Sequence, residues 1–214
     1  MAKTALLLGS TGLIGKQLLP LLLQSDNYDK VIAIARKPLE VNHPKLELVI
    51  SPLNELSQQA ERWRADDVFC CLGTTMKQAK TKEAFRAVDF HAPLWVAQLA
   101  LQQGAQQYLL VSAWGANKGS SIFYNKVKGE VEAEIGKLGY KTYHIVRPSL
   151  LLGNRQEQRT GEEAAQLFYK IFGKLIPKKY KAIESAKVAR ALLSLASSGQ
   201  SGQWVHESGA LQSY

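Results

Sequence analysis

The stretch that decides the fold reads Ala5-Leu6-Leu7-Leu8-Gly9-Ser10-Thr11-Gly12-Leu13-Ile14-Gly15. A short apolar run leads directly into three glycines spaced three residues apart, and a helical pattern follows. A strand that turns through glycines into a helix is the setting in which a dinucleotide pyrophosphate binds at the positive end of the helix. Gly9 permits the tight turn, Gly12 lets the backbone approach the phosphates, and Gly15 lets the helix pack against the strand. The whole turn, from Gly9 to Gly15, is therefore a candidate cofactor site, and a glycine-rich turn without a ligand is the alternative.

The remaining chain repeats the alternation of strand and helix patterns. Five further short apolar runs have the length and composition of buried strands, at Val31–Ala35, Leu46–Ile50, Val68–Leu72, Tyr108–Val111 and Tyr143–Val146. Amphipathic stretches with helical spacing fill most of the gaps, most clearly over residues 123–138. Continuously apolar strands that alternate with helices are typical of a parallel sheet covered on both faces. We therefore expect an α/β fold with a Rossmann-like, doubly wound parallel sheet.

The C-terminal part of the chain has a different pattern. From about residue 155 the strand signal fades, and we expect helices at 160–175 and 184–197 with a short strand near 203–206. The length of 214 residues and the 46% hydrophobic content fit one globular domain. We therefore expect residues 1–214 to form a single NAD(P)-binding Rossmann domain, with residues 155–214 as a small C-terminal helical cap.

Two basic residues, Arg36 and Lys37, directly follow the second predicted strand. A site for NAD places an acidic residue at this point, where it accepts a hydrogen bond from the ribose 2′-hydroxyl. A guanidinium group can instead hold a 2′-phosphate with paired N–H donors, and a lysine adds a point charge. The pair therefore favours NADP(H) as the cofactor, although both side chains could simply be solvated.

Charge and composition limit the other classes of partner. The chain has 27 Lys and Arg against 18 Asp and Glu, a net charge of +9, which suits an anionic ligand. Its lysine clusters contain a single aromatic residue, Tyr180, where a nucleic-acid site usually interleaves several. No apolar run reaches the roughly 20 residues of a membrane helix. The four histidines have no metal-ligand spacing, so we expect no metal. The two cysteines, Cys70 and Cys71, are adjacent and predict no disulfide framework, which favours a reducing, cytoplasmic location.

A third set of residues carries candidate chemistry. Ser112 ends the fifth predicted strand, and Tyr124 and Lys128 lie one helical turn apart on the following helix. An ammonium group close to a tyrosine favours the phenolate and brings the hydroxyl towards general acid–base catalysis. Ser112 could hydrogen-bond a substrate carbonyl oxygen at the sheet edge where ligands of α/β proteins bind. A tyrosine that packs beside a solvated lysine is the alternative.

Three longer blocks now identify a resemblance. They are Phe69-Cys70-Cys71-Leu72-Gly73-Thr74-Thr75, Tyr124-Asn125-Lys126-Val127-Lys128-Gly129-Glu130-Val131-Glu132 and Arg147-Pro148-Ser149-Leu150-Leu151-Leu152. With the glycine turn they resemble the short-chain dehydrogenases/reductases, and within them the atypical branch of the Tat-interacting-protein type. The resemblance covers nearly the whole chain, and the first two blocks are specific to that branch.

The resemblance implies roles for these residues. Tyr124 would donate the proton, Lys128 would bind the nicotinamide ribose, and Ser112 would orient the carbonyl group. The remaining cofactor contacts implied by the resemblance involve Cys71, Leu72 and Gly73 beside the adenosine, Leu151 near the nicotinamide, and Arg155 or Arg159 reaching back over the cofactor.

Two departures from the family pattern bear on activity. Ser51 stands where many members have an aspartate that contacts adenine, and Asp89 stands where many use an asparagine in a proton relay. A carboxylate cannot donate a hydrogen bond as an amide does. The departure at Asp89 therefore weakens the proton relay that turnover needs. The glycine turn, the basic pair and the Ser112, Tyr124 and Lys128 set nonetheless predict an NADPH-dependent oxidoreductase of small carbonyl compounds. A non-catalytic NADPH-binding regulator that acts through protein partners is the alternative, and the oligomeric state stays open.

Overall fold

The computed structural model describes residues 3–52, 55, 64–152 and 181–214. Its main sheet has seven parallel strands in the order β3-β2-β1-β4-β5-β6-β9. The strands are β1 (Lys3–Leu8), β2 (Tyr28–Ala35), β3 (Leu46–Ile50), β4 (Asp67–Cys70), β5 (Gln107–Val111), β6 (Thr142–Arg147) and β9 (Gly202–Glu207). Two further short strands, β7 (Leu151–Leu152) and β8 (Ile183–Glu184), pair with each other. The order is that of a Rossmann-like α/β fold, as the sequence predicts.

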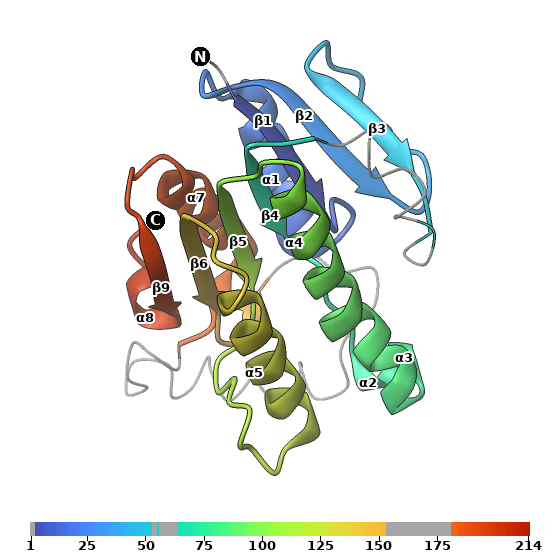
Figure 1. Ribbon diagram of the computed structural model, residues 1–214, viewed down its shortest axis with the longest axis vertical. Helices are drawn as coiled ribbons and strands as arrows, with labels where there is room; N and C mark the ends of the chain where they lie inside the picture. Colours follow the sequence, from blue (N-terminus) through green and yellow to red (C-terminus); the bar gives the residue numbers. More distant parts are fainter. Residues whose placement is uncertain (1–2, 53–54, 56–63, 153–180) are drawn as a thin grey trace.

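Helices cover both faces of this sheet (Figure 1). The longer helices are α1 (Leu13–Gln24), α4 (Ala92–Gln102), α5 (Phe123–Gly136) and α7 (Ser185–Ala196). The shorter ones are α2 (Met76–Ala79), α3 (Lys82–Arg86), the π turn η2 (Ala87–His91) and α8 (Ser208–Leu211). In Figure 1, α4 and α5 lie in front of the sheet and α1 and α7 lie behind it, and the strands end towards α2, α3 and α5. That lower edge is the carboxyl edge of the sheet, where α/β folds bind ligands.

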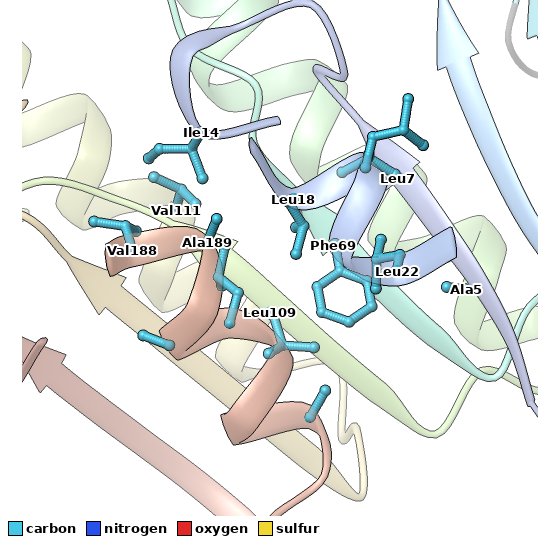
Figure 2. Close-up of a cluster of buried hydrophobic side chains, with 14 of the residues drawn as sticks. Ala5, Leu7, Ile14, Leu18, Leu22, Phe69, Leu109, Val111, Val188 and Ala189 are labelled. Atoms are coloured by element: carbon cyan, nitrogen blue, oxygen red, sulfur yellow. The ribbon is translucent and has the colours of Figure 1, made fainter. Parts of the chain in front are cut away.

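Two apolar layers explain why the strands are continuously hydrophobic. Successive residues of β1 point to opposite faces, so Leu7 packs with α1 and α7 while Leu6 and Leu8 pack on the other side. Helix α1 contributes Leu18 and Leu22, four residues apart, to the first layer, as Figure 2 shows. Both faces of the central strands are thus removed from water, which confirms the reading of these runs as buried strands.

The described C-terminal residues, 181–214, both cover the sheet and add a strand to it. Helix α7 confirms the helix expected at 184–197 and packs against α1. The short strand expected near 203–206 is β9, the seventh strand of the sheet. Strand β4 ends at Cys70, two residues before the predicted end. The helix expected at 160–175 lies outside the described residues.

Candidate functional site

At Gly9 and Gly15 the glycine turn has the conformation and close packing that its sequence suggests. Gly9 has φ +79°, and a Cβ atom there would lie 2.6 Å from the carbonyl oxygen of Cys71. The N–H of Gly12 donates to the Gly9 carbonyl at 2.9 Å, which closes the turn. A Cβ atom on Gly15 would collide with that same Gly9 carbonyl. Gly9 and Gly15 are therefore required by the conformation and packing of the chain itself.

Gly12 differs from the other two glycines, because a Cβ atom there would make a tight contact of 3.3 Å with the Gly9 carbonyl oxygen and not a collision. It is the N-cap of α1, has φ −76° and is exposed, and no side chain caps the helix. The first N–H groups of α1 have no acceptor within the helix. The buried hydroxyl of Ser10 also has no hydrogen-bond partner among the described residues. A phosphate group could accept hydrogen bonds from these donors, so the turn fits the pyrophosphate of a dinucleotide.

Arg36 and Lys37 are exposed directly after β2. Strand β2 pairs with β1 up to Ile34 beside Leu8, so both basic residues follow the strand next to the glycine turn. The structure thus brings the predicted 2′-phosphate ligands to the same sheet edge as the turn. Within the described ranges neither residue forms an ion pair with a carboxylate.

The segment after β4 lies against the turn. The N–H of Cys71 donates to the Leu8 carbonyl at 3.0 Å, and the Cys71 carbonyl faces Gly9. Burial raises the pKa of the Cys71 thiol well above its usual range, so it stays protonated at neutral pH. Leu72 and Gly73 continue this segment towards α5, because a Cβ atom on Gly73 would lie 3.8 Å from Nζ of Lys128.

Tyr124 and Lys128 lie on the first two turns of α5. Tyr124 is half-buried, whereas only 4% of Lys128 is exposed. Burial lowers the pKa of Lys128, but its interactions with Asp89 and Tyr124 raise it, and the net direction is upward. The ammonium group is therefore charged at neutral pH and lies within electrostatic reach of Tyr124, as the spacing predicts.

Asp89 is the partner of that ammonium group. Its Oδ1 lies 2.8 Å from Nζ of Lys128, and its Oδ2 accepts a hydrogen bond from the N–H of Thr74 at 2.8 Å. The carboxylate is 1% exposed and lies in the π turn η2. π turns are inserted single turns that often occur at functional sites. The sequence singled out Asp89 as a departure from the family pattern but did not predict this ion pair.

Ser112 lies at the carboxyl end of β5, and its N–H donates to the Val146 carbonyl at 2.8 Å. Its hydroxyl oxygen is buried and has no partner among the described residues. A buried hydroxyl group without a partner is costly unless a ligand completes its hydrogen bonds. Leu151 belongs to β7, while Arg155 and Arg159 lie outside the described residues.

Arg147 fixes α5 to the edge of the sheet. This residue ends β6, and its Nε and Nη2 donate to Glu132 of α5 at 3.0 and 2.6 Å. Its Nη1 donates to Glu207, the last residue of β9, at 3.0 Å. Bidentate arginine–carboxylate pairs define orientation well, so this group holds the helix that carries Tyr124 and Lys128.

Sequence reasoning also missed a contact between two histidines. His144 of β6 and His206 of β9 bring Nδ1 and Nε2 to 3.0 Å, although they are 62 residues apart. Burial and the neighbouring His206 lower the pKa of His144 to about 4. Over the described ranges no group of three or more His, Cys, Asp or Glu side chains is placed to hold a metal ion. In the same part of the chain, no helix is both long and apolar enough to cross a membrane.

Comparisons with known proteins agree with this geometry. The pattern of the NAD(P)H-binding family matches residues 9–198. Protein HTATIP2 of Rattus norvegicus is 36% identical over 208 residues, which cover 94% of this chain and 84% of that protein. Protein FMP52, mitochondrial, of Debaryomyces hansenii is 32% identical over 202 residues, which cover 91% and 88%.

A solved structure supports the fold independently. The Bordetella bronchiseptica enzyme WbmH, crystallised with NAD+, superposes with a TM-score of 0.74 at 16% identity and covers 97% of this chain and 76% of its own. At this identity the likeness concerns the fold alone. The match over residues 9–198 and the relatives above 30% identity establish the family. The chain therefore belongs to the NAD(P)H-binding Rossmann family and is homologous to HTATIP2 and FMP52.

Proposed function

We propose that the protein is an NADPH-dependent oxidoreductase that reduces a small carbonyl compound at Ser112, Tyr124 and Lys128. The observation that carries the proposal is the buried ammonium group of Lys128 within electrostatic reach of Tyr124. Tyr124 and Lys128 lie on the helix that follows β5, and Ser112 directly after β5 carries a hydroxyl group with no partner among the described residues. A charged lysine is costly to bury, and the ion pair with Asp89 at 2.8 Å offsets part of that cost. A buried, charged lysine next to a tyrosine at the ligand-binding edge of the sheet is typical of a functional site.

The three side chains have complementary tasks in such a reaction. The Ser112 hydroxyl donates a hydrogen bond to the substrate carbonyl oxygen and orients it. The reduced nicotinamide, when bound, supplies the hydride that attacks the carbonyl carbon. Tyr124 gives its hydroxyl proton to the oxygen as negative charge develops there, so the product is an alcohol. Lys128 favours the phenolate that remains and donates hydrogen bonds to the nicotinamide ribose.

The choice of NADPH over NADH rests on Arg36. Its guanidinium offers paired donors to a 2′-phosphate, and we expect NADPH to bind more tightly than NADH by roughly 1.5–3 kcal/mol. Arg36→Ala should remove most of that difference and leave NADH affinity nearly unchanged, as measured by calorimetry. Arg64→Ala, which removes another exposed arginine, serves as the control. Equal affinity of the unmodified protein for both nucleotides would refute the assignment.

The glycine turn gives a second test of the cofactor site. Gly12→Val adds a branched side chain whose Cβ would lie 3.3 Å from the Gly9 carbonyl oxygen, so the turn must shift by a few tenths of an ångström to accept it. The valine would occupy the space that the phosphates need, so NADPH affinity should fall by at least about tenfold with the fold retained. Circular dichroism checks the fold and fluorescence titration checks the binding. If this variant binds NADPH as tightly as the unmodified protein, the glycine turn is not the phosphate site.

A second candidate function is an NADPH-binding regulator without turnover, which acts through protein partners. The observation that favours it is Asp89, because a carboxylate in ion pair with Lys128 replaces the amide of the usual proton relay. A panel of small aldehydes and ketones, assayed by NADPH oxidation, separates the two functions. Turnover that Tyr124→Phe abolishes supports the enzyme, whereas NADPH binding without turnover of any compound supports the regulator.

We further propose a cytoplasmic location, on the adjacent free cysteines Cys70 and Cys71. The fungal relatives named FMP52 carry the word mitochondrial in their names. Fractionation of cells that express the tagged full chain decides between the two compartments.

A further inference from the structure

We propose that the segment from Phe85 to Asp89 positions the two catalytic side chains of α5, with Phe85 setting the ring of Tyr124 and Asp89 setting the ammonium group of Lys128. The proposal rests on the proposed function, because it assigns a task to residues around that site. Phe85 and Asp89 are four residues apart, as are Tyr124 and Lys128. Residues at this spacing share one side of a helix, so two matching pairs can face each other across two packed elements.

The first pair is aromatic. Phe85 is fully buried, and its ring centroid lies 5.7 Å from that of Tyr124 with the planes inclined at 61°. Phe123, the residue before Tyr124, lies on the same phenylalanine at 5.6 Å. Edge-to-face contacts at these separations are attractive and directional. Phe85 thus restrains the ring of Tyr124, and its apolar side chain takes no part in the chemistry of the hydroxyl group.

The second pair is ionic. Asp89 and Lys128 are 2.8 Å apart and both nearly completely buried, so water screens their attraction little. The second carboxylate oxygen of Asp89 is held by the N–H of Thr74 at 2.8 Å. The carboxylate is thereby fixed from the side of the β4–α2 connection, and it can fix the ammonium group in turn.

A third contact keeps the two elements in register. Arg86 lies next to Phe85 and reaches Glu130 of α5 at 2.6 Å. Its guanidinium also lies over the ring of Phe90, 4.5 Å from the centroid. Three successive contacts, aromatic, ionic and ionic again, thus run along the same stretch of α5. Three contacts between the segment 85–89 and α5 fix their relative position better than one contact would.

The charge of Lys128 depends on this arrangement. The titratable groups that act on it are Asp89 from η2, Tyr124 from its own helix and Cys70 from β4. Burial alone lowers the pKa of Lys128, and Asp89 is the largest influence that raises it. Without the carboxylate, the ammonium group would lose its proton at a lower pH. Asp89 therefore keeps Lys128 charged for the cofactor over a wide pH range.

The closing experiment measures NADPH affinity against pH for Asp89→Asn, by fluorescence titration between about pH 7 and about pH 9.5. The asparagine keeps an oxygen for the Thr74 N–H but carries no charge. The unmodified protein should bind NADPH with nearly constant affinity over this range. The variant should lose about tenfold or more towards the alkaline end, as Lys128 becomes neutral.

Two controls isolate the cause. Asp67→Asn changes another carboxylate that is 1% exposed, in ion pair with Lys3 at the opposite end of β4, and should leave the pH profile flat. Lys128→Met added to Asp89→Asn should remove the pH dependence, because the titrating group is gone. A flat profile for Asp89→Asn would overturn the assignment of Asp89 while leaving the proposed function intact. Failure of the unmodified protein to bind NADPH would instead refute the proposed function.

The aromatic half has its own readout in the turnover of a carbonyl compound found in the panel. Phe85→Leu should lower kcat about tenfold and leave the KM for NADPH unchanged, because a 1 Å displacement of a reacting group is costly. Asp89→Asn should mainly raise the KM for NADPH at alkaline pH. Phe69→Leu, a fully buried phenylalanine of the layer shown in Figure 2, is the control for general loss of packing. An equal kcat for Phe85→Leu and the unmodified protein would overturn the assignment of Phe85.

Discussion

Tyr124→Phe is expected to lower kcat for carbonyl reduction by about 10²–10⁴ while NADPH affinity changes little. The phenylalanine keeps the ring and its contact with Phe85, whose centroid is 5.7 Å away, so the packing of α5 should survive. Only the hydroxyl group is removed, and with it the proton that the forming alkoxide needs. Steady-state assays with the best carbonyl compound of the panel, combined with NADPH titration, measure both quantities.

A tyrosine outside the site provides the matched control. Tyr140 is buried against α4, where its hydroxyl donates to the Ala97 carbonyl at 2.6 Å. Tyr140→Phe should lower the free energy of unfolding by about 1 kcal/mol and leave kcat unchanged. If Tyr124→Phe retains full turnover, Tyr124 is not the proton donor. If both variants lose activity alike, the effect comes from stability.

Lys128→Met is expected to lower the free energy of unfolding by about 3–5 kcal/mol, because it leaves the Asp89 carboxylate buried without its partner. NADPH affinity should fall as well, by about tenfold or more, because a charged hydrogen-bond donor to the ribose is lost. Urea unfolding followed by circular dichroism measures the first effect and fluorescence titration the second.

The double variant Lys128→Met/Asp89→Leu separates these two effects. Replacing both members of a buried ion pair by apolar side chains removes the unpaired charge, so most of the stability should return. The NADPH affinity should stay low, because the donor to the ribose is still missing. If the double variant binds NADPH as tightly as the unmodified protein, Lys128 is not part of the cofactor site, even if the glycine turn binds the phosphates.

The sequence predicts those parts of the fold and site that depend on neighbouring residues. The strands at the centre of the sheet are apolar along their whole length because helices cover both faces, and such runs are visible without a structure. The turn at Gly9 is equally local, because its φ of +79° and its contact with α1 follow from glycines within seven residues. Tyr124 and Lys128 share a helix, so their spacing alone brings them together.

Contacts between distant segments could not be predicted in this way. Asp89 meets Lys128 across 39 positions of sequence, and His144 meets His206 across 62. No periodicity within either segment encodes such a pairing, since it depends on how strands and helices are placed in three dimensions. The same holds for β9, whose apolar run is short and whose place at the sheet edge is set by its pairing with β6. The ion pair of Asp89 is thus the part of the candidate site that only the structure supplies.

The π turn between α3 and α4 has a consequence for how this site can change over evolutionary time. A π turn closes i→i+5 hydrogen bonds and so holds one residue more than an α-helical turn, and a single deletion within Ala87–His91 would let α3 and α4 join as one regular α-helix. A deletion between Phe85 and Asp89 would leave them three positions apart instead of four, and the Asp89 carboxylate would shift relative to Lys128. Insertions and deletions should therefore be eliminated here by selection even where substitutions are tolerated. The length of this segment therefore matters to the candidate site as much as the identity of its residues.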